Sequence, residues 1–289
     1  GDDDDTLSAF NNAGAATVNL GLRTVAGYGA LINYTGLQTI AANASGQSLT
    51  VVATADNDTL VVTPFGGNAG TVQNNGADPV VNYTNVAANT LHVNLNSATS
   101  DDLLVVNATP AADVDIVVDE TTSTIDTGTL GGIVDYSPGA PDAITVNGLQ
   151  GSDTVTVTPG AIPVFVDGGD PIGLVGDTLA LNAIGAAEFA PGPEGDEGGF
   201  RFGGTALVSY DHIEALNLDL DGNTFDVSGT NADDDIKVLG TGATSYWLSV
   251  NDSPAIVVIN SDALTVDGLH GDDDIDIDVR DLALPGLTV

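Results

Sequence analysis

The chain has 289 residues, with 41 acidic side chains against four basic ones, which gives a formal net charge of −37. A surface of this charge repels nucleic-acid phosphates and anionic lipid headgroups, so neither nucleic acid nor a membrane is an expected partner. The absence of Cys excludes disulfides and thiolate metal sites, and no apolar run is long enough to span a bilayer. The 42% hydrophobic content argues against a disordered chain.

The acidic residues are mostly of one type, because 36 of them are Asp and only five are Glu. Asp favours turns, since its short side chain forms hydrogen bonds with nearby backbone, whereas Glu is a good helix former. This bias indicates acidic turns that could bind hard cations. The alternative is a solvated surface of the kind found in proteins adapted to high salt.

An internal repeat runs along the chain and is marked by a tyrosine box. The tyrosines are separated by 49, 53 and 74 residues, and the longest interval contains a Gly- and Pro-rich segment that predicts a loop insertion over 185–205. A fifth copy without Tyr reads Val258 to Ser261. The four complete boxes are Ile32 to Thr35, Val81 to Thr84, Val134 to Ser137 and Val208 to Asp211.

In chain order, this repeat divides the sequence into six parts. A first, irregular repeat is followed by four complete repeats, of which the third carries the insertion, and by a partial repeat at the end. The predicted boundaries are 1–54, 55–100, 101–150, 151–222, 223–270 and 271–289.

Short apolar alternations follow the boxes and lead into acidic turns, as in Ile144 to Val146 before Asp153, and Leu264 to Val266 before Asp272. Val, Ile, Leu and Thr at period two predict short strands with one buried face, and no segment predicts an amphipathic helix. The pattern predicts an all-β, repeat-built parallel β-helix or β-solenoid that forms one continuous elongated domain. Tandem small β-sandwiches are the alternative, although a sandwich typically needs about 100 residues.

The segments Gly151 to Val157, Val166 to Gly173 and Gly176 to Leu179 carry a family resemblance. The chain resembles the repeat regions of long secreted bacterial surface proteins of the planctomycete type, which are grouped with haemolysin-type, RTX-like calcium-binding proteins. The resemblance implies a calcium-stabilised parallel β-structure on a secreted or surface protein. The strict glycine-rich nonapeptide of the RTX β-roll does not occur in tandem here.

Calcium is the predicted cofactor, because Ca²⁺ takes about 6–8 oxygen ligands and an acidic turn supplies several within a few residues. For each cluster the alternative is a solvated turn whose Asp caps backbone amides. The candidate metal ligands are Asp2, Asp3, Asp4, Asp5, Asp56, Asp58, Asp101, Asp102, Asp153, Asp170, Asp177, Asp233, Asp234, Asp235, Asp272, Asp273 and Asp274.

Catalysis has little support in the sequence, and we expect no enzyme. The histidines His92, His212 and His270 lie far apart, and none belongs to a zinc-binding motif. Paired carboxylates are too frequent for any one pair to indicate glycoside hydrolysis. Tyr246 and Trp247 could stack on a sugar ring, although core or strand-face positions are more usual.

These observations predict a secreted or cell-surface structural protein that forms a fibre, stalk or surface layer. The expected partner is the protein itself in a head-to-tail homopolymer, with Asp2 to Asp5 bridging subunits through calcium. The same junction could instead be covalent within a longer array. The second hypothesis is an adhesin or carbohydrate-binding module that presents Trp247 and residues 185–205 to cell-surface polysaccharide, and the third is a polysaccharide-active enzyme.

Overall fold

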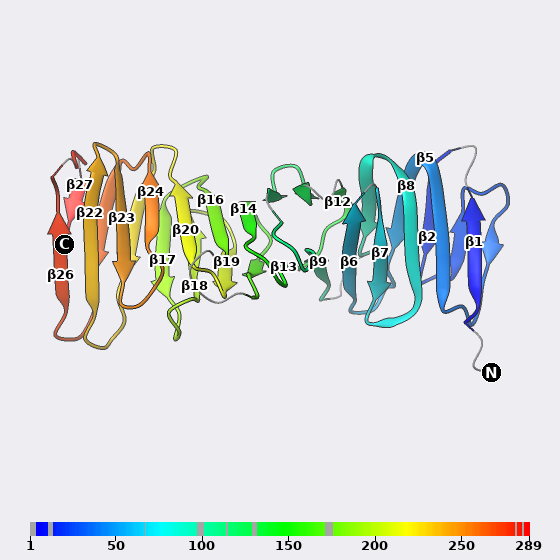
Figure 1. Cartoon of the computed structure of the whole chain (residues 1–289), viewed down its shortest axis with the longest axis horizontal. Helices are drawn as coiled ribbons and strands as arrows, with labels where there is room; N and C mark the ends of the chain where they lie inside the picture. Colours follow the sequence, from blue (N-terminus) through cyan, green and yellow to red (C-terminus); the bar gives the residue numbers. More distant parts are fainter. Residues whose placement is uncertain are drawn as a thin grey trace. The chain divides into compact units, whose positions relative to one another are not determined.

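The computed structural model is all-β in the residues that it describes, and these contain no helix, so no described helix could cross a membrane. Inter-residue contacts divide the chain into unit 1, residues 1–109 and 113–147, and unit 2, residues 110–112 and 148–289 (Figure 1). The structure describes residues 4–10, 14–66, 68–96, 101–113, 115–128, 132–170, 176–280, 282–284 and 286–289.

Unit 1 is a stack of strands that pair mainly in parallel with strands of the next turn. Thr59 faces Leu103 and Leu103 faces Ala143, so successive turns are offset by 44 and 40 residues. The strands are β1 Thr6–Phe10, β2 Ala16–Asn19, β3 Thr24–Ala26, β4 Ile32–Asn33, β5 Thr39–Val52, β6 Thr59–Gly66, β7 Ala69–Asn74, β8 Ala77–Asn94, β9 Leu103–Asn107, β10 Ile116–Asp119, β11 Thr124–Asp126, β12 Ile133–Gly139 and β13 Ala143–Asn147.

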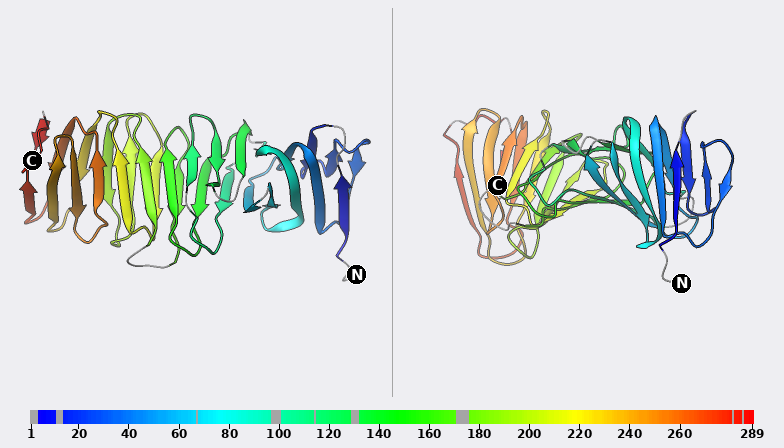
Figure 2. Two further views of the ribbon diagram at one scale, coloured as in Figure 1. Left: turned by 45° about the horizontal axis from the view of Figure 1, so that its top comes forward. Right: turned by 45° about the vertical axis from the view of Figure 1, so that its right-hand side comes forward.

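Unit 2 repeats this arrangement, with the parallel series β14–β16–β20–β24 and β17–β21–β25–β27 (Figure 2). Its strands are β14 Thr154–Thr158, β15 Val164–Asp167, β16 Thr178–Asn182, β17 Ala187–Pro191, β18 Gly198–Phe202, β19 Leu207–Asp211, β20 Ala215–Asp219, β21 Thr224–Ser228, β22 Asp235–Gly242, β23 Ser245–Val250, β24 Ile256–Ile259, β25 Ala263–Asp267, β26 Asp274–Asp278 and β27 Gly286–Thr288.

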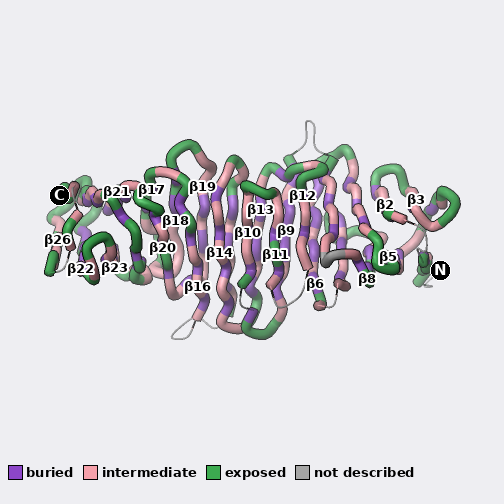
Figure 3. The backbone as a smooth tube through the Cα atoms, turned by 90° about the horizontal axis from the view of Figure 1, so that it is seen from above, coloured by how far each residue is buried: buried purple, intermediate pink, exposed green. Residues whose placement is uncertain are grey.

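Buried residues alternate with half-buried or exposed ones along most strands (Figure 3). In β14, Val155 and Val157 are buried while the intervening threonines are half-buried on the outer face. The same alternation recurs in most strands of both units. The predicted period-two pattern and the predicted all-β solenoid are therefore confirmed, and parallel pairing between consecutive turns is not the antiparallel pairing of a chain of small sandwiches.

Each tyrosine box lies at the third strand of an antiparallel three-stranded meander, which interrupts the parallel stacking. The meanders are β2–β3–β4, β6–β7–β8, β10–β11–β12, β17–β18–β19 and β22–β23–β24. The tyrosines point inward and are at most 8% exposed. The Tyr-free fifth box also falls on a third strand, β24, so the repeat read from the sequence is a structural repeat.

The 185–205 insertion differs from the expected loop, because most of it forms the antiparallel hairpin β17–β18. Phe189, Phe200 and Phe202 from this hairpin are buried, and the rings of Phe189 and Phe200 lie with their centroids 4.9 Å apart. The Gly and Pro residues that suggested a loop occupy the turn between the two strands and the strand ends next to it, Pro191 in β17 and Gly198 and Gly199 in β18. The insertion therefore enlarges the core of unit 2.

Candidate functional site

The acidic turns of unit 1 form a ladder of carboxylates between successive turns of the solenoid. Asp58, Asp102 and Asp142 each lie immediately before a strand, β6, β9 and β13 respectively. The backbone N–H of Asp58 donates to Oδ1 of Asp102 at 2.8 Å, and that of Asp102 donates to Oδ2 of Asp142 at 2.8 Å. Each carboxylate therefore binds the backbone of the preceding turn.

Unit 2 has the same ladder. The backbone N–H of Asp153 donates to Oδ1 of Asp177 at 2.6 Å, and the N–H of Asp177 donates to Oε2 of Glu214 at 2.6 Å. Further along, the N–H of Asp234 donates to Oδ1 of Asp273 at 3.1 Å. Of the predicted metal ligands, Asp58, Asp102, Asp153, Asp177, Asp234 and Asp273 are thus brought into one repeated structural role.

Two of these aspartates are also held by a Thr and an Asn in a matching arrangement. Asp58 accepts hydrogen bonds from the backbone and hydroxyl of Thr54 and, at 3.2 Å, from Nδ2 of Asn75. Asp234 accepts the corresponding bonds from Thr230 and, at 2.7 Å, from Nδ2 of Asn251. The two carboxylates are occupied by protein donors, which closes their turns.

The sequence spacing of this motif is the same in both units, with Thr four residues before Asp and Asn 17 residues after it. Burial alone would raise the pKa of Asp234, but the hydrogen bonds from Asn251 and Thr230 outweigh it and lower the pKa. The sequence analysis did not identify this motif, although the repeated spacing could have indicated it.

The other predicted calcium ligands differ in burial from Asp58, Asp102, Asp153, Asp177 and Asp234, which are buried. Asp2 and Asp3 fall outside the described residues. Exposed side chains belong to Asp4, Asp5, Asp56, Asp101, Asp170, Asp233, Asp235, Asp272 and Asp274. Within the part of the chain that the structure describes, no three of the predicted ligands meet as a group of carboxylates within 4.8 Å of one another.

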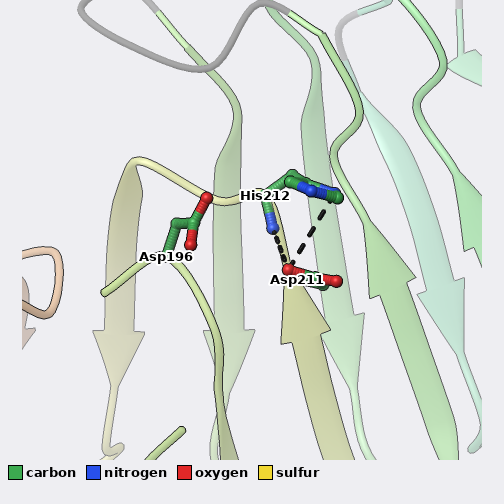
Figure 4. Close-up of side chains that lie close together, drawn as sticks. All are labelled: Asp196, Asp211 and His212. Carbon is green, nitrogen blue, oxygen red and sulfur yellow. Dashed lines mark hydrogen bonds and ion pairs between the residues drawn. The ribbon is translucent and has the colours of Figure 1, made fainter. Parts of the chain in front are cut away.

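A different trio does meet in the described residues, formed by Asp196, Asp211 and His212 (Figure 4). Asp211 ends β19, His212 follows it, and Asp196 lies in the turn of the β17–β18 hairpin. Nδ1 of His212 lies 2.9 Å from Oδ1 of Asp167 on the adjacent strand β15, and this hydrogen bond raises the pKa of His212. His212 thus joins β15 to the end of β19 through Asp167, and none of the three residues of the trio was a predicted metal ligand.

Asp177 is the most perturbed carboxyl of the ladder. It is 1% exposed, and its Oδ2 has no hydrogen-bond partner among the described residues. Burial raises the pKa of Asp177 to about 6, and the nearby carboxylates of Glu214 and Asp167 act in the same direction. Asp177 therefore titrates at a higher pH than an ordinary Asp.

A groove of about 660 Å³ lies on the outer face of unit 2, beside the trio. Its lining includes Glu188 and Arg201 of the hairpin, Phe165 of β15 and Asp211 of the trio.

The two aromatic residues predicted to stack on a sugar lie outside this groove. Tyr246 is fully buried, with its hydroxyl 3.2 Å from Oγ of Ser261, whereas Trp247 is half-buried on the outer face of β23. Because its ring is buried, Tyr246 cannot stack on a sugar, and that prediction is wrong.

Comparisons with protein-family models, curated proteins and solved structures found no match for the chain. The resemblance to calcium-binding surface repeats therefore stays a prediction from the sequence.

Proposed function

We propose that the chain is a structural element of a secreted or cell-surface fibre, stalk or surface layer, that calcium stabilises its acidic turns, and that it extends by end-to-end stacking. The single observation that carries the proposal is an incompletely covered interior at β26. Catalysis forms no part of this proposal.

The apolar side chains of β26 continue an interior row but are only partly covered. Ile275 and Ile277 are half-buried, whereas their neighbours in β22, Ile236 and Val238, are 0% and 2% exposed. Among the described strands, β26 pairs only with β22, so its other edge has no strand partner. An edge with unpaired backbone groups and an apolar face favours the addition of another turn, either from a second copy or from a longer array.

Calcium stabilisation is supported by carboxylates that are neighbours in register at the same end of unit 2. Asp235 faces Asp274 on the adjacent parallel strand, and the backbone N–H of Asp272 donates to Oδ1 of Asp233 at 2.8 Å. Lys237 pairs with Asp235 and offsets part of this charge. The remaining repulsion between like charges on adjacent strands destabilises the stack, and a divalent cation converts it into cross-linking. We also propose Asp2 to Asp5 as calcium ligands, on the clustering of their carboxylates in the sequence alone.

The assembly proposal is tested by sedimentation velocity and negative-stain electron microscopy across a concentration series, with calcium or with a chelator. We expect end-to-end oligomers with calcium, and a variant carrying Ile275→Asp and Ile277→Asp that remains monomeric and folded. The matched control is Asp276→Asn, which changes an outward-facing side chain of the same strand. A wild-type chain that stays monomeric under all conditions would contradict end-to-end stacking, as would oligomers that persist in the double variant.

A further inference from the structure

The groove on unit 2 lies over five neighbouring strands, which pair in the order β21, β17, β18, β19 and β15. Its floor is a row of small side chains, because Ala190 faces Gly199, and Gly199 faces Ser209. The row ends at Phe165 of β15, which pairs with Ser209 across the edge of β19 opposite to β18. Three small residues in line leave a hollow that larger side chains on the outer face would fill.

One wall of the groove is a row of charged residues on the same strands. Asp226 faces Glu188, and Glu188 faces Arg201, with Leu207 next in line. The other wall is the turn of the β17–β18 hairpin, which contributes Pro191, Pro193 and Glu197, together with Asp211 of β19. The volume of about 660 Å³ lies within the range of small-molecule sites.

Arg201 is one of only four basic residues in the chain and lies in the charged wall of this groove. Although Glu188 is its neighbour in register, Arg201 forms no salt bridge with any described residue. Its planar set of N–H donors is therefore available for a ligand.

Tyr210 of β19 borders the groove, although its side chain points into the interior of the solenoid. Tyr210 lines the groove and is 2% exposed, and its hydroxyl has no hydrogen-bond partner among the described residues. That hydroxyl lies against Gly198, 2.7 Å from where a β-carbon would stand on this residue, which also lines the groove. The hydroxyl of Tyr136, another box tyrosine, also has no partner among the described residues, so this feature belongs to the repeat and the case for a ligand depends on Arg201 and the shape of the groove.

The charges of the groove discriminate between classes of ligand. Four carboxylates, those of Glu188, Glu197, Asp211 and Asp226, repel a polyanion. The side chains of a basic peptide would pair with these carboxylates but would offer Arg201 no acceptor. A neutral polyhydroxylated ligand uses both kinds of group, because its hydroxyls donate to carboxylates and accept from the guanidinium.

We propose that this groove binds a neutral oligosaccharide chain. The ring of Phe165 offers an apolar face for a sugar ring, while Glu188, Arg201 and Asp226 form hydrogen bonds with hydroxyls along one wall. Glu197 and Asp211 do the same along the other wall. This binding is independent of end-to-end stacking, and it would attach the solenoid to a glycan-coated surface.

The first test is an array of linear neutral oligosaccharides built from glucose, mannose, xylose or N-acetylglucosamine. Each probe is about four to six sugar units long, which suits a groove of this size. Isothermal titration calorimetry then measures the affinity of the best probe. Arg201→Ala and Gly199→Leu should each weaken binding at least tenfold. The first variant removes the donors, and the second fills the floor, where even a β-carbon would lie 3.1 Å from Leu207.

Arg280→Ala is the matched control, because it removes an arginine that lies outside the groove. Circular dichroism and the melting temperature establish that each variant is folded. Arg201→Lys provides a milder change that keeps the charge but loses the planar donor set, and it should weaken binding less than Arg201→Ala.

The proposal is overturned if no neutral oligosaccharide binds at millimolar concentration, or if Arg201→Ala and Gly199→Leu bind as tightly as the wild type. It is also overturned if an oligolysine probe competes for the groove more strongly than the sugars do. The sedimentation behaviour of Arg201→Ala should be unchanged, so failure here is distinguishable from failure of the stacking proposal.

Discussion

The backbone N–H of Asp58 donates a 2.8 Å hydrogen bond to Oδ1 of Asp102, which lies 44 residues later in the chain and one turn further along the stack. Both side chains are 2% exposed. The acidic turns thus include carboxylates that form structural contacts in the interior, in addition to those that face solvent. This distinction determines how substitutions at the two kinds of Asp should differ.

Replacing Asp102 with Ala should destabilise unit 1 by about 1–3 kcal/mol, because it leaves the buried N–H of Asp58 without its acceptor. Chemical denaturation measures the loss, and hydrogen exchange should show faster exchange at the Asp58 amide. Asp101→Ala is the control, since Asp101 is exposed. Equal effects of the two substitutions would show that the ladder does not stabilise the fold.

The raised pKa of Asp177 predicts a defined pH dependence of stability. The folded state holds this proton up to about pH 6, whereas the unfolded chain releases it near the ordinary value of 3.8. The contribution of Asp177 to stability therefore falls as the pH rises from about 4 to about 6. Asp177→Asn should lose this dependence relative to the wild type, as measured by melting temperature at several pH values.

The direct measurement for Asp177 is a carboxyl ¹³C titration by NMR. A midpoint near the ordinary value would contradict the assignment. Comparing the wild type with Asp177→Asn removes the separate contribution of His212, whose raised pKa also makes stability fall as the pH rises, through its own titration.

Calcium should raise the melting temperature, and a chelator at constant ionic strength should lower it. A ligand at 100 times its dissociation constant contributes about 2.7 kcal/mol per independent site. Replacing the exposed pair Asp272 and Asp274 with Asn should reduce the calcium-dependent part of this stabilisation. If sodium chloride of matched ionic strength gives the same stabilisation as calcium, the acidic surface acts only through screening.

Tyr210 and Tyr246 should respond differently to the loss of one hydroxyl. Tyr246→Phe removes the bond to Ser261 and should cost about 1 kcal/mol. Tyr210→Phe removes a hydroxyl without a partner among the described residues and should be neutral or slightly stabilising. Thermal denaturation of both variants, compared with the wild type, checks the contrast, and a larger loss at Tyr210 would contradict it.

The local features of the fold could be predicted from the sequence. The alternation of Val155 and Val157 with Thr depends only on neighbouring residues, and so does the inward tyrosine of each box. The hairpin at 187–202 was misread because its turn is rich in Gly and Pro, while the buried Phe189 and Phe200 on its strands were not recognised as core.

The site depended on long-range register, which the sequence alone does not specify. Nothing local indicates that Ala190, Gly199 and Ser209 lie side by side, because small residues on three separate strands leave no pattern. The Thr–Asp–Asn motif is different, since its spacing repeats between Asp58 and Asp234 and could have been found by comparing the repeats.

The carboxylate ladder also determines the order in which the turns of unit 1 can complete their hydrogen bonds during synthesis. The amide of Asp58 needs Asp102, and the amide of Asp102 needs Asp142, so each acceptor is synthesised about 40 residues after its donor. During synthesis from the N-terminus, a turn of unit 1 reaches its final hydrogen bonding only when its successor has emerged and docked. Vectorial folding of this unit therefore proceeds one turn behind the growing chain, and a pause in translation leaves a single open turn at its leading end.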